Sequence, residues 1–257
     1  MSQGKNVSVV VSVFNEEKTV ANVVRTILDS KLVSEVVCVN DGSVDRSLEI
    51  LKGFGDKIKL MSFPRNRGKG AAMAEGIRCA HGSIILFLDA DLLNLTAEHL
   101  SKLISPLLNG KAEIVIGRFS KAPLTPPQLS GQRAYWKKDL LPFLTPLAEV
   151  RFGAEVFLNY VLRKKKKKTI LLKNVSYLKK QGKVGLKKAA KLYLDELMQI
   201  INTMGKIENK KMEKIGSILG KEVSLKEIEG IIEQLKGKEI SQKLMRYFTY
   251  LREYFSE

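Results

Sequence analysis

The feature that most constrains the fold is a regular alternation of short β-branched apolar runs with longer segments whose apolar residues recur at helical spacing. Buried parallel strands appear as continuous apolar runs, whereas amphipathic helices show a period of 3.6 residues. The predicted strands are residues 7–14, 35–40, 57–63, 83–88 and 113–119, and the predicted helices between them are 15–28, a stretch through Leu48 and Leu51, 71–80 and 96–108. This alternation predicts an α/β fold with a mainly parallel sheet flanked by helices on both faces.

Polar clusters follow the predicted strands at the points where the strands end. They are Asn15-Glu16, Asp41-Gly42-Ser43, the basic glycine-rich turn 65–70, and the pair Asp89 and Asp91. Ligands of open parallel sheets bind at the carboxyl ends of the strands. The four clusters therefore predict one site at one edge of the sheet.

The segment FLDADLLNLT places two carboxylates at the end of an apolar strand. One interpretation is that Asp91 caps the following helix while Asp89 is merely exposed. The other is that the two carboxylates share a divalent cation, because an unpaired buried carboxylate is costly. Mg²⁺ or Mn²⁺ that keeps several waters and bridges to phosphate oxygens suits such a pair. The convergence of the other clusters favours the metal interpretation.

The turn RNRGKG carries a lysine between two glycines. Lys69 is placed to bring a positive charge to a metal-bound diphosphate, and Gly68 and Gly70 would let the backbone approach it closely. Asp41 and Ser43 are candidates for hydrogen bonds to a base or a ribose. Each element is weak alone, but their joint order and spacing are specific.

The segments VSVFNEEKTV, VNDGSVDRS, RNRGKGAAMAEGI and FLDADLLNLT together resemble a family 2 glycosyltransferase with the GT-A (Rossmann-like) fold, over roughly residues 5–200. The resemblance implies a nucleotide-sugar donor, nucleotide contacts by Asn15, Glu16 and Asp41, and a DXD motif that binds the metal-diphosphate. The candidate donor-site residues are Val13, Asn15, Glu16, Asp41, Ser43, Gly68, Lys69, Asp89, Ala90 and Asp91, with Asp89 and Asp91 as metal ligands and Asp91 as a catalytic candidate.

The segments SGQRA and RFGAE resemble the acceptor side of polyprenyl-phosphate glycosyltransferases and, more loosely, of glucosyl-3-phosphoglycerate synthases. The acceptor-side candidates are Gln132, Arg133 and Glu155. If a hydroxyl is glycosylated, Glu155 is the candidate base, whereas an ionised phosphate acceptor needs none. Relatives often carry a histidine that completes the metal shell, and here Tyr177 stands at that position.

The two histidines of the chain lie elsewhere. We expect structural roles for His81, in a helix-strand turn, and for His99, in the helix after the Asp pair.

The net charge of +17 is concentrated, because residues 163–191 hold thirteen Lys and Arg and no Asp or Glu. This tract favours a phosphate-bearing partner, although a solvated helix face or an exposed loop also accounts for it. A polyprenyl-phosphate acceptor would place the enzyme at a membrane surface, with residues 164–168 against anionic headgroups. LLPFLTPL at 140–147 would either enter that interface or pack in the core, and core packing is favoured.

The chain is expected to form a glycosyltransferase domain over 1–204, with a nucleotide-sugar half at 1–120 and an acceptor half at 121–204. A helix opening at 153–155, a strand at 171–178 and a helix at 187–204 are predicted in the second half. Residues 205–257 are predicted to form a C-terminal helical extension whose apolar stripes pack on the domain, with a homodimer contact or a membrane-surface role as less favoured alternatives. No signal peptide or membrane-spanning run is evident, so a cytoplasmic location with reduced Cys38 and Cys79 is the expectation.

Two other function classes remain open at this point. A non-catalytic protein that binds sugar nucleotides or nucleic acid fits the lysine tract, but stacking aromatics are sparse there, so no nucleic-acid partner is expected. A sugar nucleotidyltransferase would carry its glycine-rich loop after the first strand, where this chain has FNEEKT.

Overall fold

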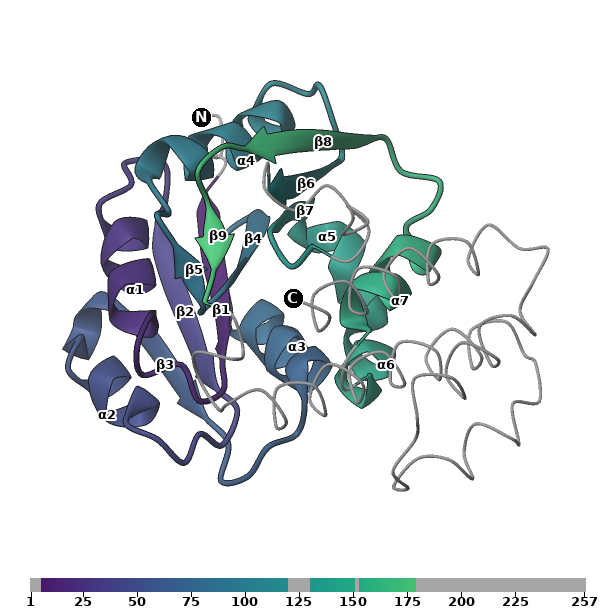
Figure 1. The fold of residues 1–257 in the computed structure, drawn as a ribbon. Helices are drawn as coiled ribbons and strands as arrows, with labels where there is room; N and C mark the ends of the chain where they lie inside the picture. Colours follow the sequence, from purple (N-terminus) through teal and green to yellow (C-terminus); the bar gives the residue numbers. More distant parts are fainter. Residues whose placement is uncertain (1–5, 120–129, 151–152, 179–257) are drawn as a thin grey trace, which may run out of the picture.

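The computed structural model describes residues 6–119, 130–150 and 153–178. Within these ranges a seven-stranded sheet crosses the molecule, and helices cover both of its faces (Figure 1). The proline-rich segment 123–127, the predicted helix 187–204 and the C-terminal stripes lie outside the described residues. In the described part of the chain no helix is long and apolar enough to cross a membrane.

The sheet has the strand order β3-β2-β1-β4-β7-β6-β8, and a two-stranded ribbon joins β5 to β9. All neighbouring pairs in the large sheet are parallel except those of β7, which runs antiparallel to both β4 and β6. The strands are β1 Val7–Val13, β2 Glu35–Asn40, β3 Lys59–Ser62, β4 Ile84–Asp89, β5 Leu92–Leu93, β6 Ile114–Phe119, β7 Arg133–Trp136, β8 Lys167–Leu172 and β9 Ser176–Tyr177.

The helices lie in two layers. The first layer is made of α1 Val20–Leu28, α2 Ser47–Lys52 and α4 Ala97–Leu108. The second is made of α3 Lys69–Cys79, α5 Lys137–Leu140, α6 Leu144–Glu149 and α7 Ala154–Val161. Short 3-10 turns complete the connections at Gly55–Lys57 and Leu141–Phe143.

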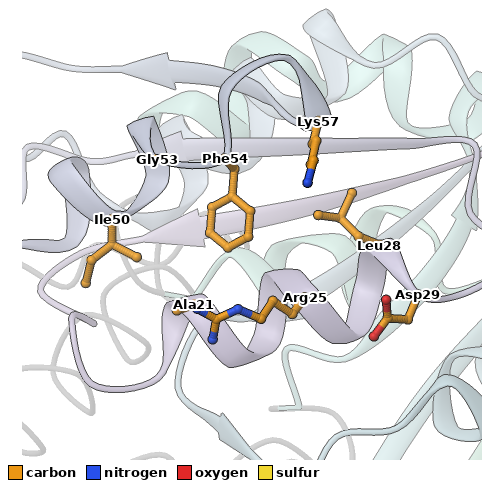
Figure 2. Close-up of a pocket in the computed structure, with 8 residues that line it drawn as sticks. All are labelled: Ala21, Arg25, Leu28, Asp29, Ile50, Gly53, Phe54 and Lys57. Carbon is orange, nitrogen blue, oxygen red and sulfur yellow. The ribbon is translucent and has the colours of Figure 1, made fainter.

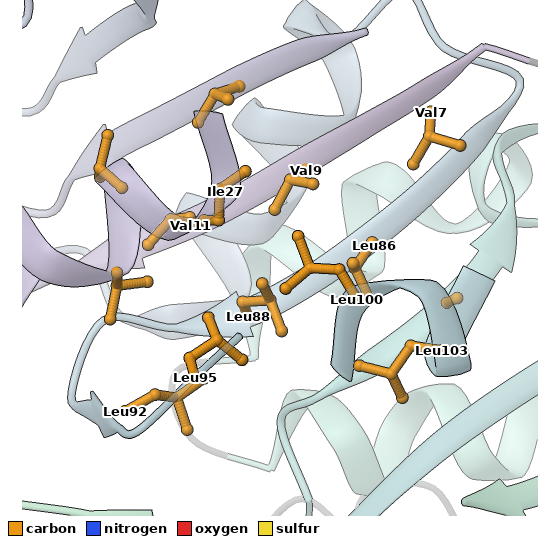
Figure 3. Close-up of a cluster of buried hydrophobic side chains, with 14 of the residues drawn as sticks. Val7, Val9, Val11, Ile27, Leu86, Leu88, Leu92, Leu95, Leu100 and Leu103 are labelled. Carbon is orange, nitrogen blue, oxygen red and sulfur yellow. The ribbon is translucent and has the colours of Figure 1, made fainter. Parts of the chain in front are cut away.

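Alternation along the buried strands divides the core in two. Figure 3 shows one half, in which Val7, Val9 and Val11 of β1 meet the α1 and α4 side chains. On the other face Val10 of β1 packs with the α3 layer. Apolar side chains on both faces explain why β1 is a continuous valine-rich run, and they confirm the predicted mainly parallel, doubly covered sheet.

Several boundaries differ from the sequence-based expectations. The first helix begins at Val20 rather than at residue 15, because Asn15 adopts a left-handed backbone with φ of 57°. The predicted strand 171–178 is wrong in extent: β8 starts within the lysine run at Lys167, and Asn174, with φ of 62°, separates it from β9. In the described part of the run, Lys167 and Lys168 therefore belong to an edge strand, and residues 164–166 lie in the loop before it.

Four apolar residues of the stretch 140–147 pack in the core, as favoured: Leu140 and Leu147 are fully buried, and Phe143 and Leu144 are partly buried against the same cluster. The rest of the stretch, namely Leu141, Pro142, Thr145 and Pro146, is exposed.

Candidate active site

Neighbouring strands bring the predicted clusters to one edge of the sheet. Val13 of β1 pairs with Asn40 of β2, and Ser12 of β1 pairs with Asp89 of β4. Because these three strands are parallel, the residues that follow them emerge side by side. The sequence-based expectation of one strand-end site is thus matched by the topology.

The loops after β1 and β2 are joined to each other by hydrogen bonds. The Asn15 backbone N–H donates to Ser43 Oγ at 3.0 Å, and the Val44 N–H donates to Asn15 Oδ1 at 2.9 Å. The Glu16 N–H donates to Ser47 Oγ at 2.8 Å. The Asn15 and Ser43 side chains therefore help to shape this wall of the site, and their contact with a nucleotide stays a prediction.

Asp41 holds the basic glycine-rich turn in place. Its buried carboxylate accepts hydrogen bonds from the Arg67 N–H at 2.7 Å, the Gly68 N–H at 2.9 Å and Asn66 Nδ2 at 2.9 Å. Gly42 has a φ of 70°, and a Cβ there would lie 2.4 Å from the Arg65 carbonyl carbon. The turn and the end of β2 are thus packed backbone against backbone, a relationship that the sequence analysis did not anticipate.

Lys69 begins α3 directly after this turn and links two carboxylates. Its Nζ lies 2.7 Å from Asp89 Oδ1 and 2.6 Å from Glu155 Oε1. Burial alone would lower the pKa of the Lys69 ammonium, but the charges and hydrogen bonds of Asp89 and Glu155 outweigh it and raise that pKa above its usual value. Lys69 is therefore a fixed positive charge in the site.

Gln132 reaches the second oxygen of Asp89. Its Nε2 donates to Asp89 Oδ2 at 2.6 Å, while Ser130 Oγ donates to Gln132 Oε1 at 2.8 Å. A Cβ on Gly131 would lie 2.3 Å from Asp89 Oδ2, so a larger residue there would have to displace this carboxylate. Asp89 is oriented from both sides, by Lys69 of the first half and Gln132 of the second.

One face of the sheet carries these groups. Asp89 follows Ile85 and Phe87 at alternate positions, and both belong to the core on the α3 side. Arg133 lies opposite Phe87, on the same face. The site therefore lies between the sheet edge and helices α3 and α7, which carry Lys69 and Glu155.

Arg133 has no exposed surface. Its guanidinium donates to the Ser130 carbonyl, to Tyr135 Oη at 3.2 Å and to Asn159 Oδ1 at 2.9 Å. These bonds tie β7 to α7 and so fix the helix that carries Glu155. Acceptor binding by Arg133 stays a prediction, and the geometry supports a positioning role.

Arg118 is a candidate site residue that could not be singled out from the sequence. It lies on β6 two positions after Ile116, hence on the α3 face near the carboxyl edge, and the neighbouring Gly117 N–H bonds to the Gln132 carbonyl at 2.8 Å. Within the described ranges its Nε is buried without a hydrogen-bond partner. A buried donor of this kind fits an anionic ligand. The run EIVIGRF carries no local signal that marks Arg118 as functional, because its pattern is that of an ordinary buried strand.

Tyr177, which stands where relatives often carry a metal-binding histidine, lies in the short strand next to Asp91. The Leu178 N–H donates to the Asp91 carbonyl at 2.9 Å, and Tyr177 pairs with Leu92 across the β5–β9 ribbon. Tyr177 packs its ring against Phe119 at 5.8 Å between centroids. Among the described residues no group of three or more His, Cys, Asp and Glu is arranged to hold a metal. Metal binding by Asp89 and Asp91 stays a prediction.

Both histidines have structural contacts, in line with the expectation. His99 Nδ1 lies 2.8 Å from Thr96 Oγ1 at the start of α4, and His99 Nε2 lies 3.0 Å from the Lys173 carbonyl oxygen. His81 contacts Glu35 at the opposite edge of the sheet.

Two of the predicted donor-site residues, Val13 and Ala90, have side chains that point away from the site. Val13 is fully buried and Ala90 nearly so, and both belong to the core on the α1 side. Only their backbone groups are left for a ligand, and the Val13 carbonyl already accepts from the Asp41 N–H at 2.8 Å.

The described part of the basic tract begins far from the aspartates. Lys167 pairs with Ile114 at the start of β6, and Lys165 bonds to Glu113 and Asp139. Residues 163–167 therefore lie at the amino edge of the sheet. The site edge is about 17 Å away along β8 at ~3.3 Å per residue.

A separate groove lies between α1 and the end of α2, on the other face of the sheet from Lys69. Figure 2 shows Phe54 pointing toward Arg25 across it, with Leu28 and Ile50 on its sides. None of the predicted site residues lines this groove. It is not the site predicted from the strand ends.

Known proteins resemble this chain over the same region. The family model Glycosyl transferase family 2 matches residues 8–180. A glucosyl-3-phosphoglycerate synthase of Mycolicibacterium smegmatis is 34 % identical over 128 residues, which is 47 % of this chain and 42 % of the relative. A dolichyl-phosphate beta-glucosyltransferase of Mus musculus is 32 % identical over 156 residues, which is 54 % of this chain and 48 % of the relative. The chain thus spans less than half the length of these curated relatives.

A solved structure supports the fold. Glucosyl-3-phosphoglycerate synthase of Mycobacterium tuberculosis, in complex with Mn²⁺, UDP-glucose and phosphoglyceric acid, superposes with a TM-score of 0.61 at 21 % identity, covering 79 % of this chain and 80 % of that one. The predicted GT-A fold is confirmed by this likeness and by the strand order. Since the family model covers most of the chain and includes every strand-end cluster, the chain belongs to glycosyl transferase family 2.

Proposed function

We propose that this protein transfers a hexosyl group from a UDP- or GDP-sugar to a phosphate-bearing acceptor. The observation that carries the proposal is the meeting of Asp89, Lys69 and Gln132 at the end of β4. Paired carboxylates beside a fixed ammonium suit a sugar diphosphate, whose negative charge grows as the glycosidic bond breaks. Two similar curated proteins are named as a glucosyl-3-phosphoglycerate synthase and a dolichyl-phosphate beta-glucosyltransferase, which supports the reaction class.

The site fits Mg²⁺ or Mn²⁺, held by Asp91 and Asp89. Such ions are bound in proteins by one or two carboxylates together with substrate phosphates and water, so two aspartates are a sufficient donor set. The ion would supply Lewis-acid stabilisation of the leaving diphosphate. Lys69 adds a second positive charge there, and the turn held by Asp41 keeps Lys69 at the N-terminus of α3.

A phosphate-bearing acceptor is supported by Arg118. Its Nε is buried and has no hydrogen-bond partner among the described residues, and it lies on the same side of the sheet as Lys69 and Glu155. Guanidinium groups bind phosphate with charge-assisted hydrogen bonds. An ionised phosphate is itself the nucleophile, so the site needs no strong base. We name polyprenyl phosphate as the leading acceptor class.

Peripheral contact with an anionic membrane, at its cytoplasmic face, is part of this proposal. The edge strand β8 exposes Lys167, Thr169 and Leu171, and Lys164 and Lys166 before it are exposed as well. Lysines together with an apolar side chain along one open strand suit an anionic lipid surface. If β8 lies on that surface, it runs from the lysines at its start to the edge of the sheet where Asp89 lies.

A phosphoglycerate is the second candidate acceptor. The specific observation in its favour is the similarity to the mycobacterial synthase whose solved structure holds UDP-glucose and phosphoglyceric acid. Both acceptors carry a phosphate, so the same Arg118 argument applies to each.

The donor is tested first. Nucleotide sugars are screened by thermal shift with Mn²⁺, since a ligand well above its Kd stabilises the fold by a few kcal/mol. Asp91→Asn should lose both the Mn²⁺-dependent shift and donor hydrolysis. Asp56→Asn, an exposed aspartate in the turn after α2, is the matched control. If Asp91→Asn keeps both properties, the transferase proposal is wrong.

The acceptor is tested with the donor that binds. Transfer to polyprenyl phosphate in vesicles and transfer to 3-phosphoglycerate in solution are measured side by side. Flotation with phosphatidylserine vesicles at moderate salt tests the membrane contact. Replacing Lys166 and Lys167 by Glu should abolish flotation, whereas the same charge change at the exposed Lys31 and Lys52 should not. Binding to RNA but not to vesicles would contradict the membrane proposal.

A further inference from the structure

Glu155 occupies an unusual position for a proton acceptor. Its side chain is only 10 % exposed, and its Oε1 lies 2.6 Å from the Lys69 ammonium. It stands in the first turn of α7, directly after Gly153 and Ala154, and Gly153 has a left-handed φ of 86° that starts the helix. The helix start therefore aims Glu155 at Lys69.

Lys69 is shared between the two halves of the domain. One carboxylate partner, Asp89, ends β4 of the nucleotide-sugar half, and the other, Glu155, belongs to the acceptor half. Asp89 has a second donor in Gln132, so its orientation does not depend on Lys69 alone. The Lys69 ammonium thus pairs with Glu155 as well as with Asp89, and without Glu155 it would pair with Asp89 alone.

The charges of these groups set the attraction for a divalent cation. Asp89, Asp91 and Glu155 each contribute one negative charge and Lys69 one positive charge, which leaves the group at about −2 when all are ionised. Without Glu155 the net charge of the group becomes about −1, and Lys69 then neutralises Asp89 alone. Without Lys69 the group rises to about −3, but the diphosphate loses a cationic partner.

We propose that Glu155 is a positioning residue: it holds Lys69 between the two halves and keeps Asp89 attractive to the divalent cation, rather than accepting a proton from the acceptor. This inference rests on the proposed function, because it concerns the same metal-diphosphate site. It adds a role for the acceptor-half carboxylate in donor binding and couples the halves through one ammonium.

The proposal gives opposite effects for the two ends of the Lys69–Glu155 pair. Mn²⁺ binding to the full chain without nucleotide is titrated by calorimetry and by the loss of free-ion EPR signal. Glu155→Gln should weaken Mn²⁺ binding about fivefold, and Lys69→Met should tighten it by a similar factor, because each variant changes the charge around the ion by one unit and solvent and salt screen most of that difference. The Lys69→Met/Glu155→Gln double variant should return close to the wild-type affinity.

Affinity for UDP in saturating Mn²⁺ separates the two residues further. Lys69→Met should weaken UDP binding about tenfold. In the Mn²⁺ titration, Glu155→Asp should recover most of the affinity that Glu155→Gln loses. Asp139→Asn is the matched control, because Asp139 pairs with Lys165 at the other edge of the sheet and its loss should leave the Mn²⁺ affinity unchanged. Circular dichroism verifies that each variant is folded.

The outcomes are distinguishable. If wild-type protein binds Mn²⁺ and Glu155→Gln binds it equally well while transfer is lost, Glu155 acts on the acceptor and the inference is overturned. If wild-type protein binds no Mn²⁺ and Asp91→Asn changes nothing, the proposed metal site itself is wrong, and the inference falls with it. If Glu155→Gln does not fold, tightened Mn²⁺ binding in Lys69→Met still supports the shared charge, and unchanged binding there rejects it.

Discussion

The Asp41 carboxylate accepts a 2.9 Å hydrogen bond from the backbone N–H of Gly68, and this contact joins the end of β2 to the start of α3. The same carboxylate bonds to the Arg67 N–H. Gly68 has a φ of 97°, which suits glycine, and it is the last residue before Lys69. The position of the Lys69 ammonium therefore depends on an acceptor 28 residues earlier in the sequence.

Asp41→Asn should destabilise the protein and weaken nucleotide-sugar binding together. The amide has one acceptor oxygen for two backbone N–H groups and turns a donor toward one of them, a loss of about 1–3 kcal/mol. Urea unfolding and thermal melts measure this cost. Asp56→Asn, at an exposed turn, should change the free energy of unfolding by less than about 0.5 kcal/mol. A stable Asp41→Asn protein with normal donor affinity would show that the turn does not need this carboxylate.

Gly70→Ala should separate α3 from α6. A Cβ at position 70 would lie 1.9 Å from the Val150 carbonyl oxygen and 2.3 Å from that of Leu147, so backbone must move. We expect a loss of about 1–3 kcal/mol despite the better helix propensity of alanine. Gly53→Ala, where the nearest atom is 3.2 Å away, should be close to neutral. Equal melting temperatures for the two variants would contradict the packing seen at Gly70.

Alkaline pH should destabilise the fold through Cys38. Burial raises the pKa of its thiol to about 12. In the unfolded chain a thiol ionises near ~8.5, so above that pH the unfolded state releases a proton that the folded state retains. Stability is therefore unaffected by this group below pH ~8.5 and falls by up to about 1.4 kcal/mol per pH unit from there toward pH 12.

Urea unfolding between pH 8 and 10.5 measures this dependence. Cys38→Ala should flatten the profile relative to Cys79→Ala, whose thiol is only half-buried. If the free energy of unfolding falls with pH equally in the two variants, another group controls the loss of stability at alkaline pH.

Arg118→Met should raise the KM for the phosphate-bearing acceptor by about 10- to 100-fold, the value of a charge-assisted hydrogen bond of roughly 1.5–3 kcal/mol. Affinity for UDP should change little, because the proposed donor site is formed by Lys69 and the aspartates. Arg118→Lys should recover part of the loss, since the charge is kept and the planar fork is not. Steady-state kinetics with both substrates varied check this. A change in donor affinity alone would place Arg118 on the donor side.

Much of the fold could be predicted because the informative strands are buried on both faces. The runs at 35–40 and 83–88 have few alternatives to a central parallel strand, and β2 has the predicted bounds. The placement of Tyr177 beside Asp91 was also anticipated by resemblance. The strand-end clusters met at one edge because parallel strands leave no other arrangement.

The unpredicted parts have physical reasons too. Strand β8 begins with two exposed lysines and buries only Leu172 fully, because an edge strand needs little apolar surface. Strand β7 has four residues, too few for a periodic signal. The Lys69–Glu155 pair joins residues 86 positions apart, and Arg118 lies within a run that looks apolar. Long-range pairing of this kind is settled by tertiary packing.

The turn between α4 and β6 has a practical consequence for anyone who labels or fuses this protein. Residues 109–111 are exposed, and a Cβ at Gly110 would meet nothing within 4 Å. The turn enters β6 at its amino end, across the sheet from Asp89. A fluorophore or an affinity tag inserted there projects away from the proposed donor site, so this turn is the preferred attachment point for reporting on ligand binding without obstructing it.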